Sequence, residues 1–537
     1  MMTSEREKLS PKEVRNMKRK WISLSALLLA ALMLFACAAT EQTAEETAVA
    51  TPDESFVLSN GENSQPPEGM GQPPEGFNGQ PPEGFNGQPP EGFNGQPPQG
   101  GPGEPPSGSP GGMGQPPSGG PGGMPGGPGG SAANVTYSGA TEISSAETQE
   151  NGTYASETAD QSALLIATDD AVSITNPTVT KTGDSDGGDN CNFYGLNAAV
   201  LCKDGASVTI TGGTITTSAF GANGVFSYGG NGGRNGAAGD GTTVTIRDTV
   251  ITTAGGGSGG IMTTGGGTTY AYDLTVTTSG QSSAPIRTDR GGGTVYVDGG
   301  TYTSNGLGSP AIYSTAEIHV ANATLVSNLS EGVCIEGKNS IELTDCDLTA
   351  NNTKCNSNAT FFDTIMIYQS MSGDADSGTS SFTMTRGTLT SKNGHMFHIT
   401  NTNAIINLSG VTLRNEDSEN ILLSVCADGW SGAKNIATLN AVGQALSGTI
   451  LVGSDSTLTL NLTEGSAFTG AISGNITNMK GTVVSAEVGT VNVTLDGTST
   501  WTLTGDTYVT SFTGDAANVV SNGYALYVNG VALSGTN

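Results

Sequence analysis

The sequence is short of positive charge, of aromatic side chains and of long apolar runs. Lys and Arg number 20 against 49 Asp and Glu, so the formal net charge is −29. Residues 1–36 hold seven of the basic and three of the acidic side chains, which leaves −33 for the rest of the chain. A surface of this sign repels phosphate, which argues against nucleic acid as a partner and favours cations or neutral ligands such as sugars. Aromatic residues make up only 6%, which argues against a bulky globular α/β core.

Cysteine and histidine are also scarce. The chain has seven cysteines and three scattered histidines, with no Cys-x-x-Cys, so the sequence does not predict a zinc site. Six cysteines follow Cys37, an even number that permits up to three disulfides in an exported chain. Cys191 and Cys202 bracket one loop and are the predicted pair. Buried thiols are the alternative for Cys334, Cys346, Cys355 and Cys426.

The beginning of the chain is typical of an export signal. A basic stretch precedes an apolar run from Trp21 to Ala36, shorter than the ~20 residues that span a bilayer. We assign a signal peptide to residues 1–37, with Met1 or Met17 as the start. The run ends in the letters LFAC, which resemble a bacterial lipobox and predict lipid on Cys37; ordinary cleavage nearby is the alternative. We expect a surface protein that contacts the membrane only through this anchor, or otherwise a secreted one.

Residues 38–134 predict a disordered tether. An acidic, Thr- and Ala-rich spacer is followed by the octapeptide GQPPEGFN, which occurs three times from residue 71 and decays into Pro and Gly. Frequent Pro prevents helices and sheet ladders, and Gly adds flexibility. No later apolar stretch approaches 18 residues, so the sequence predicts no transmembrane helix beyond the signal.

From about residue 135 one ten-residue phrase recurs in a Gly-, Thr- and Val-rich background. Its clearest copy is VTITGGTITT at residues 208–217, and copies start 23 to 41 residues apart, most often 23 to 26. The first, third and eighth positions are usually apolar and the residues between are mostly polar. This pattern predicts two short strands with one inward face, meeting at Gly, Asn or Asp. The copies start at Val172, Val208, Val244, Thr269, Val295, Ile318, Ile341, Phe382 and Ile406.

A third short apolar segment, which we call the third apolar step, follows several copies of the phrase, as at Val225-Phe226. Three short strands per repeat predict an all-β solenoid, a parallel β-helix whose coils cannot bury their apolar faces alone. We assign this helix to residues 135–436, and further coils with a C-terminal cap to residues 437–537. The side chains expected in buried columns are Ile210, Ile215, Ile246, Ile251, Val276, Val297, Ile312, Ile318 and Ile341.

Three stretches carry a family resemblance: RTDRGGG at 287–293, SPAIYST at 309–315 and EGKNS at 336–340, with NFYGLNAAV at 192–200 as a weaker fourth. They resemble exported bacterial adhesin-like β-helix proteins. More distantly, the tether and solenoid are similar to surface carbohydrate-binding β-helices related in fold to polysaccharide lyases. The resemblance implies a right-handed parallel β-helix at the cell surface and supplies no catalytic residues.

A strip on three successive coils gathers side chains that are rare in this chain. Strand alternation predicts Ile286 inward and Arg287 outward, near Tyr313 of the next coil. A guanidinium beside an aromatic ring can hold a uronate carboxylate while the ring stacks on a sugar. A ladder of salt bridges between coils is the alternative. The candidate ligand-binding residues are Arg287, Asp289, Arg290, Tyr313, Glu336 and Lys338.

A Gly-loosened loop places three carboxylates close together in the sequence, at Asp184, Asp186 and Asp189. Calcium prefers several oxygen ligands of this flexible, hard kind, so the loop predicts calcium as a cofactor. The spacing matches known calcium loops only in part, because a distal bidentate Glu is missing. A solvated acidic insertion is the alternative.

These features predict a non-catalytic, adhesin-like or carbohydrate-binding protein whose partner is a polysaccharide or a host or cell-surface glycan. The alternative is a calcium-dependent polysaccharide lyase acting on acidic glycans, with Arg287, Arg290 or Lys338 as the base. No dense acidic cluster lies one coil from these residues in sequence phase, which favours binding. A remote alternative is an ice-binding solenoid, because Thr-x-Thr recurs at one strand position; β-propensity on an exposed face explains the recurrence better.

Overall fold

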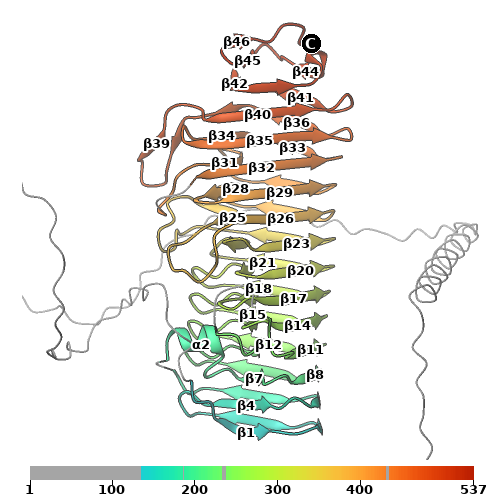
Figure 1. Cartoon of the computed structure of the whole chain (residues 1–537), viewed down its shortest axis with the longest axis vertical. Coiled ribbons are helices and arrows are strands. Elements are labelled where there is room, and N and C mark those ends of the chain that lie inside the picture. Colours follow the sequence, from blue (N-terminus) through green and yellow to red (C-terminus); the bar gives the residue numbers. More distant parts are fainter. Residues whose placement is uncertain (1–134, 186, 233–237, 431–433) are drawn as a thin grey trace, which may run out of the picture. The chain divides into compact units, whose positions relative to one another are not determined.

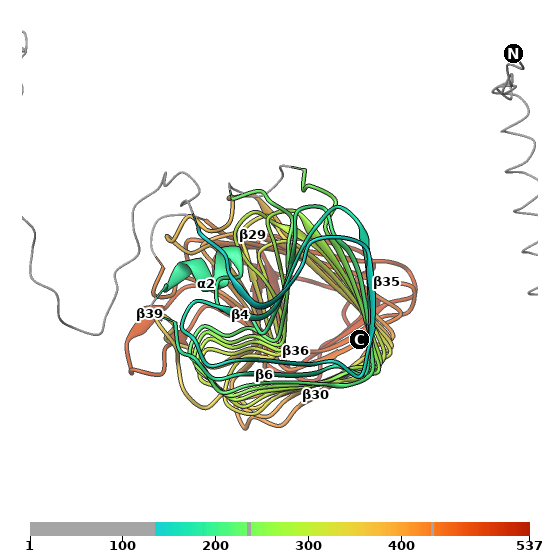
Figure 2. The same ribbon diagram turned by 90° about the horizontal axis from the view of Figure 1, so that it is seen from below.

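A computed structural model describes residues 135–185, 187–232, 238–430 and 434–537. The predicted signal peptide with Cys37, the predicted tether and Asp186 lie outside these residues. The described chain is an all-β solenoid, a parallel β-helix in which successive strands enter three long sheets in turn (Figure 1). We call these sheets A, B and C. Figure 2 views the coils along their axis and shows β6 and β30 of sheet C superposed along one side.

Sheet A has 13 strands and corresponds to the third apolar step of the repeat. Its strands are β1 (Gly139–Ile143), β4 (Ser162–Ala167), β7 (Val200–Lys203), β10 (Val225–Tyr228), β13 (Ile261–Thr264), β16 (Ile286–Thr288), β19 (Ile312–Ser314), β22 (Val333–Glu336), β25 (Asp363–Tyr368), β28 (His395–Thr400), β31 (Ile421–Val425), β34 (Thr449–Val452) and β37 (Ile472–Ser473).

Sheet B has 14 strands and contains the first half of each phrase. Its strands are β2 (Glu147–Glu150), β5 (Ala171–Thr175), β8 (Ser207–Thr211), β11 (Thr243–Arg247), β14 (Gly267–Tyr272), β17 (Gly293–Asp298), β20 (Glu317–Ala321), β23 (Ser340–Thr344), β26 (Thr379–Thr385), β29 (Asn403–Ser409), β32 (Asn435–Val442), β35 (Ser456–Thr463), β40 (Thr490–Leu495) and β43 (Ser511–Thr513).

Sheet C has 10 strands and contains the second half of each phrase. Its strands are β3 (Thr153–Ser156), β6 (Thr178–Lys181), β9 (Thr214–Thr217), β12 (Val250–Thr253), β15 (Thr275–Thr278), β18 (Thr301–Ser304), β21 (Thr324–Ser327), β24 (Asp347–Ala350), β27 (Thr388–Ser391) and β30 (Thr412–Asn415).

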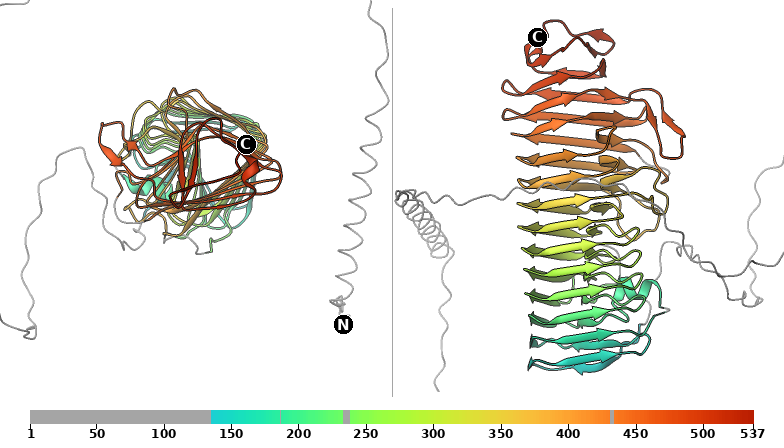
Figure 3. Two further views of the ribbon diagram at one scale, coloured as in Figure 1. Left: turned by 90° about the horizontal axis from the view of Figure 1, so that it is seen from above. Right: turned by 180° about the vertical axis from the view of Figure 1, so that it is seen from behind.

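The C-terminal coils add smaller sheets, visible in the right-hand view of Figure 3. The last pairing, of β45 with β46, is antiparallel, so the stack ends on a change of strand direction. The four-stranded sheet comprises β33 (Ala445–Ser447), β36 (Ala467–Gly470), β41 (Thr500–Leu503) and β44 (Val519–Val520). The remaining elements are β38 (Ile476–Thr477), β39 (Val483–Ser485), β42 (Thr507–Val509), β45 (Leu526–Val528), β46 (Val531–Ala532), the helix α2 (Asp189–Tyr194) and the short 3-10 helix η1 (Ala516–Asn518).

Inward side chains stack in register from coil to coil. In sheet B, Val208 pairs with Val244, Val244 with Thr269, and Thr269 with Val295. Thr269, the polar exception in the repeat, is buried, and its hydroxyl lies 2.6 Å from that of Thr263. The expected columns are confirmed, because every predicted side chain is at most 3% exposed: Ile210, Ile215, Ile246, Ile251, Val276, Val297, Ile312, Ile318 and Ile341.

The corner between sheets B and C depends on residues that adopt the left-handed backbone conformation. Asn176, Asp248, Asp273, Asn322 and Asp345 each occupy this corner with φ between 49° and 56°. Asn and Asp tolerate this region better than other residues with a side chain, and Gly takes it freely. The Gly, Asn and Asp between the two halves of each phrase therefore turn the chain from one sheet into the next.

Sheet A is covered on both faces along most of its length, unlike the other two sheets. Its outward side chains form a second apolar layer that includes Leu201, Phe226 and Met262, packed against Phe193 and Tyr194 of α2. Long connections that interrupt the regular repeat therefore lie over the outside of sheet A. Outward side chains of this sheet that lie beneath the connections are therefore shielded from bulk water.

The structure does not contain the expected disulfide between Cys191 and Cys202. Cys202 faces the main core on β7, where it is in register with Ile166 of the coil before. Cys191 lies on α2, outside sheet A, with its Sγ 3.1 Å from Ser185 Oγ. Strand alternation turns Cys202 into the core, whereas Cys191 lies on α2 outside sheet A, so the two sulfurs are on different sides of this sheet. The spacing of the two residues along the chain did not predict this separation.

The recurrent Thr-x-Thr pairs lie on the outer face of sheet C. Thr178 pairs with Thr214, and both are exposed. Val250 and Asp347 interrupt the same column. A mixed column of this kind fits β-propensity on a solvated face.

Replacing Ile246 by Ala should lower the free energy of unfolding by about 2–5 kcal/mol, because the change leaves a cavity in a closed apolar column. Thr252→Ala, an exposed position on the same coil, is the matched control and should change stability by less than about 0.5 kcal/mol. Urea unfolding of both variants measures the difference. Equal losses of unfolding free energy in the two variants would contradict the assignment of Ile246 to the inner face and Thr252 to the outer face.

The cysteine arrangement is tested by alkylating the unfolded chain without a reductant. Mass spectrometry of its peptides should find alkylated thiols at all six described positions, because each is a thiol in the structure. A peptide pair joined through Cys191 and Cys202 would show the disulfide after all.

Candidate functional site

A cavity of about 400 Å³ lies outside sheet A, over β16, β19, β22 and β25. Arg287 pairs with Tyr313, Tyr313 with Cys334, and Cys334 with Met366, so outward positions of successive coils line its floor. The neighbourhood of Arg287 and Tyr313 expected from strand alternation is thereby confirmed. Residues from the connections complete the walls: Ser282, Glu331, Asn356, Ser370, Ser372, Asp374 and Trp430.

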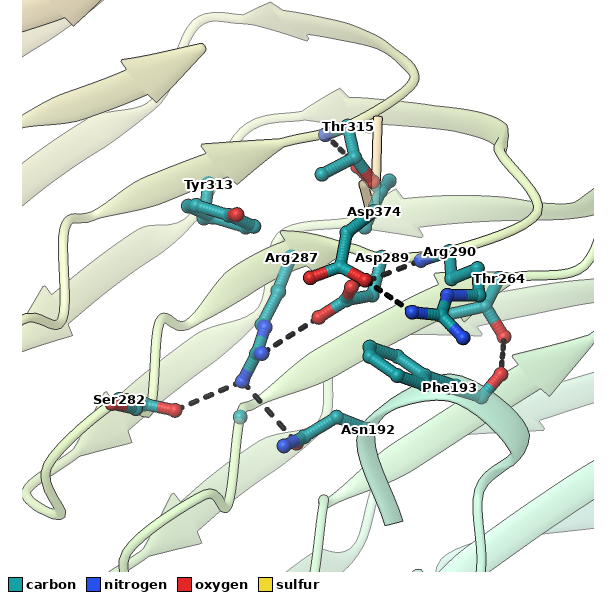
Figure 4. A network of polar contacts seen from close by, with 12 residues as sticks. Asn192, Phe193, Thr264, Ser282, Arg287, Asp289, Arg290, Tyr313, Thr315 and Asp374 are labelled. Carbon is teal, nitrogen blue, oxygen red and sulfur yellow. Dashed lines mark hydrogen bonds and ion pairs between the residues drawn. The ribbon is translucent and has the colours of Figure 1, made fainter. Parts of the chain in front are cut away.

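The guanidinium of Arg287 is held by three partners (Figure 4). It donates to Asp289 Oδ2 at 2.7 Å, to the main-chain oxygen of Ser282 at 2.9 Å and to Asn192 Oδ1 of α2 at 3.3 Å. Its central carbon lies 5.6 Å from the centre of the Tyr313 ring. Arg287 therefore ties β16 to α2 and to its own preceding loop.

Asp289 supports Arg287 from a position only 3% exposed. Its second oxygen, Oδ1, accepts a hydrogen bond from the main-chain amide of Arg290 at 2.9 Å. Burial raises the pKa of Asp289 to about 6, although the charge of Arg287 acts in the opposite direction. Asp289 is therefore a charged partner of Arg287 at neutral pH and takes up a proton under mildly acidic conditions.

Arg290 turns away from the cavity. It donates to Asp374 at 2.5 Å and lies 4.2 Å from the centre of the Phe193 ring. Burial opposes the charge on Arg290, but the hydrogen bond and charge of Asp374 outweigh it and raise the pKa of the guanidinium. Arg290 therefore links Asp374 to Phe193 of the outer apolar layer and holds Asp374 in place.

The carboxylate of Glu336 is the centre of a hydroxyl network on the cavity wall. Its Oε2 accepts from the hydroxyls of Tyr313 at 2.5 Å and Tyr368 at 3.0 Å. Its Oε1 accepts from Ser372 at 3.2 Å and from Ser370. Burial and the charge of Glu336 raise the pKa of both tyrosines well above the ordinary value, so both stay protonated donors. The side chain is 2% exposed, and four neutral donors replace the water that it loses.

Two aromatic rings that the sequence analysis missed complete the site. Trp430 follows β31, and its ring lies 4.9 Å from that of Tyr368 at an angle of 52°. Both line the cavity, as does Asp374 from the connection after β25. Trp is rare, with three in the chain, and 41 residues separate the phrases at Ile341 and Phe382. The rare Trp and the long interval between phrases mark the part of the chain that forms the site, but neither predicts the contact between Trp430 and Tyr368.

Lys338 does not join the other candidates. It pairs with Asp376 at 3.0 Å, its side chain is 44% exposed, and it borders a different hollow beside Asn339 and the Gly291–Gly293 turn. Of the six predicted residues, Arg287, Tyr313 and Glu336 line the cavity, and Asp289 holds Arg287 from behind. Three of the predicted residues therefore line a cavity and two ion pairs support it, while ligand binding by these residues stays a prediction.

The predicted calcium loop shows no assembled site among its described residues. Asp184 is exposed, and its Oδ1 accepts from the main-chain amide of Phe220 at 2.7 Å. Asp189 is exposed at the start of α2, and Asp186 lies outside the described residues. Within the described ranges, no group of three or more His, Cys, Asp or Glu residues is arranged to hold a metal ion. Calcium binding stays a prediction.

No protein-family model matches the chain, and neither a curated protein nor a solved structure matches it. Among the described residues, no helix has the length and apolar character needed to cross a membrane.

Nuclear magnetic resonance of a chain carrying ¹³C-labelled Asp should find a carboxyl that titrates near pH 6 and disappears in Asp289→Asn. Burial is the cause, because it disfavours the ionised form. Asp345 is the internal control, since hydrogen bonds from exposed Arg386 hold its pKa below the usual value. An Asp289 signal that titrates with Asp345 would contradict the buried environment.

Proposed function

We propose that the protein is an exported, adhesin-like β-helix, anchored to the cell surface through lipid on Cys37, that binds carbohydrate without transforming it. The predicted signal, the predicted Pro- and Gly-rich tether and the family resemblance support the location. The partner is a polysaccharide or a glycan of a cell surface.

The observation that carries this proposal is the pairing of aromatic walls with fixed polar groups in one cavity. Its volume of about 400 Å³ lies in the range of ~300–1,000 Å³ typical of small-ligand sites. Trp430, Tyr368 and Tyr313 offer apolar surface to the C–H faces of a sugar. Asn356 and Asp374 offer polar atoms to its hydroxyls.

The lyase alternative has less support. Arg287 is paired with Asp289, and Arg290 with Asp374, so neither guanidinium is placed to lose a proton and act as a base. Lys338 borders another hollow. Of the three candidate bases, therefore, none combines access to the cavity with a reason to be deprotonated.

A glycan array probed with the full chain and with Trp430→Ala tests the proposal. The variant should lose at least about tenfold in retention of the bound glycans, because one aromatic wall is removed. Tyr508→Ala removes an exposed aromatic side chain of the C-terminal coils and is the matched control. Circular dichroism establishes that each variant is folded.

Unchanged retention by folded Trp430→Ala would contradict the assignment of the cavity. Release of unsaturated products absorbing in the ultraviolet, from pectate or alginate, would instead favour the lyase.

A further inference from the structure

The cavity carries more negative than positive charge. Its charged lining residues are Arg287, Glu331, Glu336 and Asp374. Arg287 is balanced by Asp289, and Asp374 is balanced by Arg290. Among the described residues, the ion pairs of the structure include neither glutamate. The uncompensated charge of the site is therefore that of Glu336, together with Glu331 whenever it is ionised.

Arg287 is poorly placed to attract an anion, although it lines the cavity. It already donates to one carboxylate, one carbonyl and one side-chain amide. A uronate entering the cavity would have to compete with Asp289 for the guanidinium and would also approach Glu336. Like charges in a sheltered site repel strongly, because little water screens them.

The aromatic walls are suited to a cation. Tyr313 and Tyr368 both donate their hydroxyls to Glu336. A phenol that donates to a carboxylate becomes more electron-rich, because hydrogen bonds in such a chain polarise one another. Electron-rich ring faces attract cations, and Trp is the strongest of the aromatic partners. Tyr368 and Trp430, inclined at 52°, form two such walls beside the buried charge.

We propose that the cavity selects a sugar that carries a protonated amino group, a hexosamine that is not N-acylated. This inference rests on the proposed carbohydrate binding and names the class of sugar bound at the same site. The ammonium group packs against Tyr368 and Trp430 under the field of Glu336, and the rest of the sugar occupies the polar side of the cavity.

Matched sugars that differ only at C2 test the inference on the full chain. The probes are hexose, N-acetylhexosamine and hexosamine in the gluco and galacto series, with the corresponding β-1,4-linked disaccharides of the gluco series. Calorimetry at about pH 6.5 keeps the amine protonated, because such amines titrate near the ~7.7–8.0 of an α-amino group. The hexosamine should bind at least about tenfold more tightly than the hexose, and this preference should weaken as salt is added.

Glu336→Gln is the decisive variant, because it removes the charge and keeps the shape of the side chain. It should abolish the preference for the hexosamine, measured as the ratio of the affinities for hexosamine and hexose in the same variant. Glu342→Gln is the matched control: it makes the same change at an exposed side chain on sheet B and should keep the preference. If Glu336→Gln does not fold, Tyr368→Phe removes one donor with little change of shape and should reduce the preference.

The outcomes separate this inference from the proposed function. Equal affinity for hexose and hexosamine, both lost in Trp430→Ala, would overturn the inference and leave carbohydrate binding in place. A preference that survives in Glu336→Gln would also overturn it, because the attraction would then come from the net charge of the chain. If no member of the series binds, the inference is wrong, and the glycan array decides separately whether the chain binds carbohydrate.

Discussion

Everything in this structure depends on the stacking of one coil on the next. Parallel main-chain pairing runs from Val172 through Val208 and Val244 and continues without a change of register to Ile406. A single coil has an apolar inner face that it cannot bury by itself, so neighbouring coils supply each other's core. The stability of any coil therefore belongs largely to its contacts with the coils before and after it.

The same register also organises the outside of the molecule. When inward side chains align, the outward side chains between them align as well, and this is why Arg287 and Tyr313 meet. Regular coils alone would leave these side chains on a bare wall. The connections that cover sheet A turn part of the wall into a sheltered cavity, where Trp430 and Asp374 join the outward residues.

Exclusion of bulk water changes how the charged side chains of the site interact. Burying an ion pair has an unfavourable desolvation free energy that the attraction between the two charges only partly offsets. Pairs such as Arg287 with Asp289 therefore fix the geometry of the site more than they stabilise the fold. Glu336 is stabilised differently, by four hydroxyls and no cation. No ion pair of the described residues includes this carboxylate, and this distinguishes the cavity from an ordinary surface ladder of salt bridges.

The sequence by itself determined the class of fold and the inner faces of the strands, because alternation and the repeat of the phrase are local properties. Every predicted inward side chain, from Ile210 to Ile341, is buried.

Only the tertiary structure decided which outward residues act together. Trp430 and Tyr368 are 62 positions apart, and connections of irregular length have no periodicity from which their path could be predicted. For the same reason Lys338, close in sequence to Glu336, lies at a different hollow, and Cys191 and Cys202, close in sequence to each other, lie on different sides of a sheet. Local patterns determine the face of each strand, whereas the path of the connections determines the site.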